Sequence, residues 1–177
     1  MKNFNKFNFN RGFTIIETLV AISILMLSIV GPLTVSQKSL SASLYAKDQV
    51  IASFLAQDAM EYLKNIRDGE GYSDLMDTVG GCIISNPCNI DTIENKIASC
   101  PLNGDCEKLY IKDGEGYTTA SNGNNTIPSI FRRVFYVDTI NISNSGEEAN
   151  FIVKVTWQNG TIKNHTVLED QFFDIIR

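Results

Sequence analysis

Hydrophobic and polar positions divide the chain into stretches with different periods. Residues 13–30 are almost continuously apolar, and Glu17 is their only charge. Farther on, hydrophobic positions recur every three or four residues, which is the period of one helix face. That stripe comprises Leu33, Gln37, Leu40, Leu44, Ile51, Leu55, Ala59, Tyr62 and Ile66. The pattern predicts a helix over residues 13–67, apolar on all sides in its first half and along one stripe in its second.

Gly31-Pro32 interrupts this helical pattern. Proline removes a backbone donor and crowds the preceding turn, so we expect a kink or local melting there. The interruption suggests a division of the helix into a membrane-spanning part, residues 13–33, and an amphipathic part, residues 34–67.

The C-terminal third has the period of strands. Residues 131–140 are β-branched and aromatic, and residues 150–157 alternate cleanly, with Phe151, Val153, Val155 and Trp157 on one face. Asn159-Gly160 is a strong hairpin signal, and residues 161–169 form the returning strand. We therefore predict an antiparallel sheet of at least three strands in residues 131–177, covered on one face by the helix stripe, in an α+β roll. Residues 68–130 are turn-rich and are expected to form a loop region.

Charge is distributed unevenly along the chain. The whole chain has a formal net charge of −5, but residues 1–12 contain three basic residues and no acid, so the remainder carries 12 Lys and Arg against 20 Asp and Glu. An excess of eight acids is unfavourable for binding phosphates. We expect no nucleic-acid partner and no docking of the body on anionic lipid.

All four cysteines lie within 25 residues: Cys82, Cys88, Cys100 and Cys106. The C-x5-C spacing is wider than zinc sites generally use, so we predict no metal site. An even number of cysteines in a loop-rich stretch favours two disulfides in an oxidising compartment. Of the three pairings, the two local ones are slightly favoured, because Pro87 and Asn103-Gly104 promote tight reversals. Four reduced, buried thiols are the alternative.

The apolar stretch is long enough to cross a bilayer. Because positive charges precede it, its amino end should be cytoplasmic and the body should lie outside, in the periplasm or beyond the cell. Glu17 then needs a reason, since a carboxylate at the centre of a lipid-embedded helix costs roughly 2.5–3.5 kcal/mol. Cleavage between Gly12 and Phe13 would create a cationic amine four residues before Glu17. Pairing of that amine with Glu17 on a neighbouring chain would set the register between helices.

The stretch "RGFTIIETLVAISIL", which includes Gly12, Phe13 and Glu17, resembles the prepilin signal of type IV pilins and type II secretion pseudopilins. The resemblance implies that residues 1–12 are a leader, cleaved by a prepilin peptidase that also N-methylates Phe13. It implies that Glu17 guides assembly with other pilin subunits at an inner-membrane assembly platform. It also implies a long kinked helix packed on an antiparallel sheet. Residues 51–69 and 151–173 resemble, more loosely, minor pilins of the type IV pilus modification class and the I-type pseudopilin.

These features predict a structural filament subunit, a minor pilin or pseudopilin. The alternative is an adhesin or cargo-binding module displayed at a filament tip through the cysteine-rich residues 80–106. We predict no enzymatic activity and no cofactor, because no nucleophile–base pair, metal cluster or phosphate loop stands out. His165 is expected to be an ordinary strand residue, and Asp58 and Glu61 to form a solvated helix face.

Overall fold

The computed structural model describes residues 12–101, 106, 108–121, 126–143 and 146–174. The predicted leader therefore lies outside the described residues, apart from Gly12. By its internal contacts the chain divides into two compact units, residues 1–45 and 46–177. We call the second unit the head domain.

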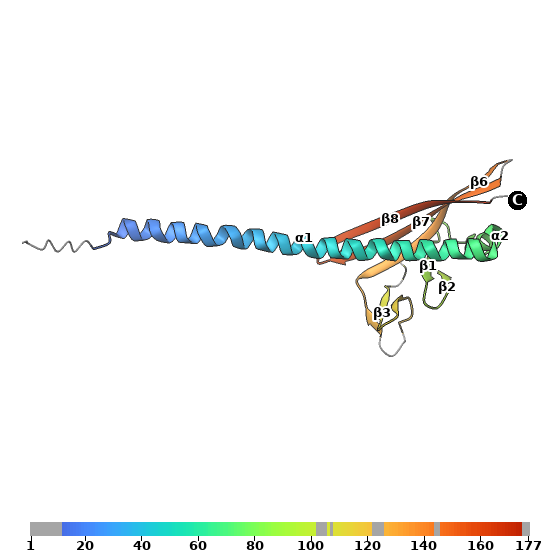
Figure 1. Ribbon diagram of the computed structural model, residues 1–177, viewed down its shortest axis with the longest axis horizontal. Coiled ribbons are helices and arrows are strands. Elements are labelled where there is room, and N and C mark those ends of the chain that lie inside the picture. Colours follow the sequence, from blue (N-terminus) through green and yellow to red (C-terminus); the bar gives the residue numbers. More distant parts are fainter. Residues whose placement is uncertain (1–11, 102–105, 107, 122–125, 144–145, 175–177) are drawn as a thin grey trace, which may run out of the picture. The chain divides into compact units, whose positions relative to one another are not determined.

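The first unit consists, where it is described, of the N-terminal part of helix α1, Ile15–Glu70 (Figure 1). We expected a kink or local melting of the helix at Gly31-Pro32. The expectation of melting is wrong, because α1 continues through Pro32 without a break. A proline removes only one hydrogen bond from the ladder, and the helical turns on both sides keep theirs. The helix also extends three residues past Arg67, the predicted end.

The head domain packs the C-terminal part of α1 on an antiparallel sheet, which confirms the predicted α+β class. The larger sheet has five strands in the order β2-β1-β6-β7-β8, and a smaller sheet has three in the order β4-β3-β5. The strands are β1 (Cys88–Asp91), β2 (Lys96–Ser99), β3 (Tyr110–Lys112), β4 (Gly116–Thr118), β5 (Thr126–Pro128), β6 (Phe131–Ser143), β7 (Gly146–Asn159) and β8 (Ile162–Phe173).

Residues 68–130 are more ordered than the prediction of a loop region allowed. They contain the short helix α2 (Tyr72–Val79) and five strands of three or four residues each. Tyr72, Leu75 and Val79 are buried along one side of α2. Elements this short carry too few periods to be separated from turns by pattern alone.

The predicted alternation of β7 is confirmed, with Phe151, Val153, Val155 and Trp157 all buried. The hairpin turn is one residue later than predicted. Asn159 pairs with Ile162, so the loop is Gly160-Thr161 and Gly160 adopts a positive φ of 60°. The Asn159 side chain contacts the helix, since its Nδ2 donates to Asp48 Oδ2 on α1 at 2.6 Å.

The buried face of α1 begins at Ala52. Its members are Ala52, Leu55, Ala56, Ala59, Met60 and Leu63, and they join one core with the inward residues of β6 and β7. Of the predicted stripe, Leu55 and Ala59 are buried, and Ile51, Tyr62 and Ile66 are partly buried against the core. Leu33, Leu40 and Leu44 are exposed. The head domain therefore uses only the second half of the stripe, from Ile51 onward.

Candidate functional site

The amino end of α1 is held by a cap. The backbone N–H of Glu17 donates to Thr14 Oγ1 at 3.3 Å and to the Thr14 carbonyl at 3.1 Å, and the N–H of Thr18 donates to the same carbonyl at 3.2 Å. Thr-x-x-Glu is the sequence of a capping box, a signal that was available in the sequence and was missed. An acid in the first turn also interacts favourably with the helix dipole. The cap itself uses the backbone N–H of Glu17, and its carboxylate favours the helix through its place in the first turn.

The predicted cleavage position lies just before this cap. Gly12 and Phe13 are both exposed, and the Phe13 side chain is 79% accessible. No atom lies within 4 Å of the position that a Cβ on Gly12 would occupy. The peptide bond between these two residues is therefore open to another molecule. The structure brings Gly12, Phe13 and Glu17 together at one end of one helix.

Most of the first unit is an uncovered apolar surface. Eighteen consecutive residues near the start of α1 have a mean hydropathy of 2.2 and include none that is buried, and the helix is long enough to cross a membrane. Large side chains such as Ile15, Leu27 and Val35 are each at least two-thirds exposed. Exposed apolar surface on this scale calls for lipid or for other helices.

Hydroxyl groups in this helix are satisfied locally. Thr18, Ser23, Ser28 and Thr34 each donate to a backbone carbonyl three or four residues earlier, at 2.7–2.8 Å. Such bonds leave no hydroxyl donor to be solvated, as an apolar environment requires. Glu17 is different, because it takes part in no ion pair among the described residues and the next charge along the chain is Lys38. Glu17 is therefore the one ionisable group in a segment otherwise adapted to lipid.

The four cysteines lie in the head domain, away from this helix end in sequence. Cys82 is bonded to Cys88 and Cys100 to Cys106, with Cα–Cα separations of 5.3 and 4.8 Å. These are the two local pairs that the turn residues slightly favoured. All four side chains are buried. Among the described residues no group of three or more His, Cys, Asp or Glu is placed to hold a metal.

A buried arginine, which the sequence analysis did not single out, joins the helix to the sheet. Arg133 on β6 is 1% exposed; its Nη1 donates to the Leu55 carbonyl at 2.9 Å and to Asp58 Oδ2 at 2.8 Å, and its Nη2 donates to the Ile90 carbonyl at 2.7 Å. Burial lowers the pKa of Arg133, and Asp58 opposes that shift. Asp58 is thus the partner of a buried cation and not simply part of a solvated face.

A second polar centre joins the two sheets at Asp91, at the end of β1. Its Oδ1 accepts the backbone N–H groups of Ile93 and Glu94, and its Oδ2 accepts the Thr118 and Thr119 hydroxyls and the Thr119 N–H, at 2.6–3.1 Å. Burial raises the pKa of Asp91, but these hydrogen bonds outweigh it and lower the value to about 2. The donors fully account for this carboxylate, so Asp91 is structural.

Comparison with known proteins concerns the amino end of the chain. Residues 8–31 match the family model described as the prokaryotic N-terminal methylation motif. No curated protein and no solved structure matches the chain. The matched residues include the open Gly12–Phe13 bond, the Thr14–Glu17 cap and much of the uncovered apolar helix. Residues 8–31 therefore carry a type IV prepilin-like signal.

Proposed function

We propose that the chain is a structural subunit, a minor pilin or pseudopilin, of a type IV pilus-like filament or a type II secretion pseudopilus. A prepilin peptidase cuts between Gly12 and Phe13 and methylates the new amine. The helix from Phe13 to about Leu33 anchors the subunit in the membrane, with its amino end cytoplasmic and the head domain outside. The subunit then enters a filament in which such helices bundle. The matched motif on a bare, lipid-compatible helix carries this proposal.

Electrostatics gives the assembly step its direction. A single subunit in lipid carries one carboxylate with no cation among its described neighbours. The amine of a processed Phe13 on an adjacent subunit supplies the missing charge, and opposite charges attract more strongly in a medium of low dielectric constant. Docking is favoured only at the axial offset that brings the two groups together. The pair therefore acts as a register mark between helices.

The direct test is the intact mass and N-terminal sequence of the protein extracted from native membranes. We expect a chain that begins at an N-methylated Phe13. Replacing the small residue before the cut by Gly12→Leu should leave the uncleaved chain in the membrane and remove it from filaments. Gly31→Leu is the matched control, because Gly31 also has nothing within 4 Å of its Cβ position but lies within α1. A mature chain that begins anywhere other than Phe13 would overturn the proposal.

Display at a filament tip through residues 80–106 is the second candidate. The two disulfides close short loops in this segment, and a hollow of about 430 Å³ is lined in part by Cys100, Pro101 and Cys106. Opening the second loop with Cys100→Ser and Cys106→Ser together should then abolish adhesion or cargo binding with filaments unchanged. Loss of filaments together with adhesion would count against a separate tip role.

A further inference from the structure

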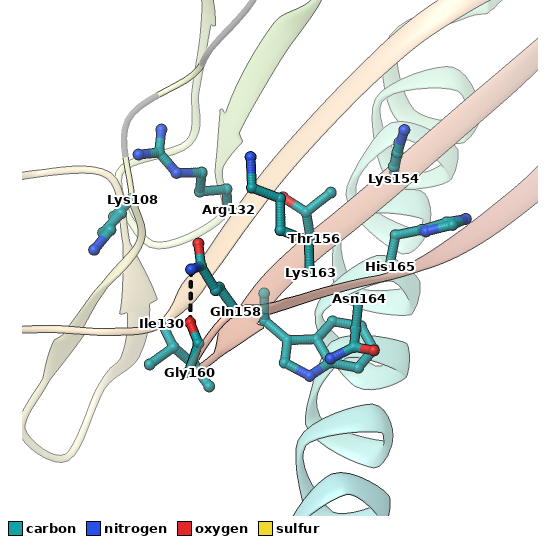
Figure 2. Close-up of a pocket in the computed structure, with 11 residues that line it drawn as sticks. Lys108, Ile130, Arg132, Lys154, Thr156, Gln158, Gly160, Lys163, Asn164 and His165 are labelled. Atoms are coloured by element: carbon teal, nitrogen blue, oxygen red, sulfur yellow. Dashed lines mark hydrogen bonds between the residues drawn. The ribbon is translucent and has the colours of Figure 1, made fainter.

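The outward face of the five-stranded sheet carries a group of cations at the end where β7 turns into β8. Figure 2 shows the hollow at this place, which has a volume of about 720 Å³. Its basic lining residues are Lys108, Arg132, Lys154, Lys163 and His165, and no Asp or Glu occurs among the described residues that line it. We call it the basic hollow.

Strand register places these side chains on one face. Arg132 lies opposite Thr156, and Thr156 lies opposite His165, so a single row crosses β6, β7 and β8. Lys154 follows on the same face because side chains alternate along a strand. The intervening Arg133, Val155 and Trp157 are buried. The basic hollow therefore lies on the side of the sheet that α1 does not cover.

The charges of the basic hollow contrast with those of the whole chain. Residues 13–177 contain 12 Lys and Arg against 20 Asp and Glu, yet four of those twelve line this one place. Lys108, Lys154 and Lys163 are in no ion pair among the described residues. Like charges held together repel, and a bound anionic group relieves that repulsion. The arrangement is therefore suited to carboxylates, phosphates or sulfates.

The chain has an acidic surface of its own. Asp68, Glu70, Asp74 and Asp77 are all exposed and lie within ten residues at the end of α1 and on α2, and we call them the acidic end. Arg67 pairs with Asp68, but no lysine or arginine occurs from 68 to 95. Three more carboxylates lie nearby: burial raises the pKa of Tyr72 on α2, and Glu147, Asp174 and Glu148 raise it further.

The basic hollow and the acidic end lie at opposite ends of the head domain. Asp48 of α1 is bonded to Asn159 at the β7–β8 turn, next to the basic hollow. Farther along α1, Lys64 pairs with Asp170, and the Arg67 guanidinium lies 4.8 Å from the centre of the Phe172 ring. Between Asp48 and Arg67 the helix rises about 28 Å at about 1.5 Å per residue. Figure 1 shows α2 following this end of α1.

We propose that the basic hollow of one copy receives the acidic end of a second copy. This inference rests on the proposed function, because it concerns the contact between heads in a filament. The two surfaces differ, so the contact is head to tail, and in a filament it repeats from one copy to the next. Residues 13–177 as a whole contain eight more acids than bases, and this excess opposes the binding of a long polyanion such as a nucleic acid. The same excess supplies the carboxylates that a second copy brings.

The first test is a zero-length carbodiimide crosslink between carboxylates and amines in filaments or membranes containing the full chain. Mixed ¹⁴N- and ¹⁵N-labelled copies identify links between chains. We expect intermolecular links from Lys154 or Lys163 to Asp74 or Asp77. These links should disappear at 1 M salt, where the screening length is only about 3 Å. Links from these lysines mainly to other carboxylates, or to another protein, would overturn the proposal.

The second test reverses charges. Lys163→Glu alone and Asp77→Lys alone should each reduce linking at least about fivefold. Mixing the two variants should restore it, because each reversed surface then meets its reversed partner. Lys96→Glu and Asp113→Lys are matched controls at exposed positions outside both surfaces and should leave linking unchanged. A loss with Lys163→Glu but none with Asp77→Lys would show that the occupant is not a second copy.

The N-terminal mass separates this inference from the proposed function. Each variant should still begin at Phe13 and remain in the membrane, since the changes lie in the head domain. If the chain does not begin at Phe13, the proposed function fails whatever the heads do. If it begins there and the mixed variants do not regain their links, only the head-to-tail contact fails.

Discussion

The two parts of α1 differ in whether their apolar side chains are buried by the rest of the chain. From Ala52 to Leu63 the helix buries its small and branched side chains under a sheet of its own chain, whereas residues such as Ile16 and Leu27 are more than two-thirds exposed. Polar groups follow the same division. Hydroxyls near the amino end bond to carbonyls of their own helix, while Arg133 and the Oδ2 atom of Asp91 bond to residues 27 to 78 positions away. The C-terminal part of α1 is buried by its own head domain, whereas the N-terminal part needs lipid or other helices to cover it.

Removing the Glu17 charge from the exposed, apolar part of α1 should have the largest effect. Glu17→Ala should leave the protein inserted in the membrane, because a neutral residue is less costly in lipid. It should reduce incorporation into filaments at least about tenfold, the factor that corresponds to 1.4 kcal/mol of lost contact. Quantitative immunoblotting of sheared filaments against the membrane fraction measures this. Thr18→Ala is the control, since its hydroxyl bonds only to the Ile15 carbonyl. Normal incorporation of Glu17→Ala would mean that the carboxylate has no assembly role.

Substitutions in the head domain should instead change its free energy of unfolding. Asp58→Ala leaves the buried Arg133 guanidinium without its anion and should lower the free energy of unfolding by about 2–3 kcal/mol. The loss stays at the low end for a broken buried pair because the Asp58 side chain is itself 48% exposed. Denaturant unfolding of the full chain in detergent measures it. Glu61→Ala, one turn along on an exposed position, should change stability by less than about 0.5 kcal/mol. Equal effects for the two variants would refute the special role of Asp58.

Low pH should destabilise the head domain through protonation of Asp91. Its pKa in the fold is about 2, below the ordinary 3.8, so its contribution is complete above pH 4 and is lost as the pH falls towards 2. The difference corresponds to about 2 kcal/mol. Thermal unfolding between pH 5 and 2 should show this slope, and Asp91→Asn should remove most of it. An unchanged slope in Asp91→Asn would assign acid sensitivity to other groups.

The smallest effect should come from the exposed ion pair between Lys64 and Asp170. Both side chains are more than a third accessible, and such pairs contribute little because water and salt screen them. Lys64→Ala should lower stability by no more than about 0.5 kcal/mol, and less at high salt. A loss above 1 kcal/mol in the denaturant measurement would show that this contact helps to fix α1 on β8.

Sequence patterns were sufficient where a period ran long enough. The long helix, the inward face of β7 and the presence of a hairpin near Asn159 all followed from spacing. The prepilin-like signal followed from a short, specific order of residue types. The strands of residues 88–128 escaped prediction because three or four residues hold no measurable period, and they are fixed by contacts with distant residues such as Cys88 with Phe135.

Polar centres were harder to predict than the apolar pattern. Arg133 stands next to Arg132 in the sequence, and only the alternation of β6 sends one inward to Asp58 and the other to the Cys106 carbonyl. Nothing local marks Asp91 as the acceptor of donors from Thr118 and Thr119, 27 and 28 residues away. The basic hollow likewise depends on the register of three strands, which is set by tertiary pairing. The Thr14–Glu17 cap was readable in advance.

Pro32 removes one backbone hydrogen bond from α1, because its nitrogen has no hydrogen to donate to the carbonyl of Ser28. A helix under tension unwinds first where a backbone hydrogen bond is missing. Each residue that unwinds there lengthens the chain from about 1.5 Å to at most about 3.3–3.6 Å. If the helices of a filament bear load along their axes, the turn around Pro32 is where this subunit can stretch without tearing its head domain.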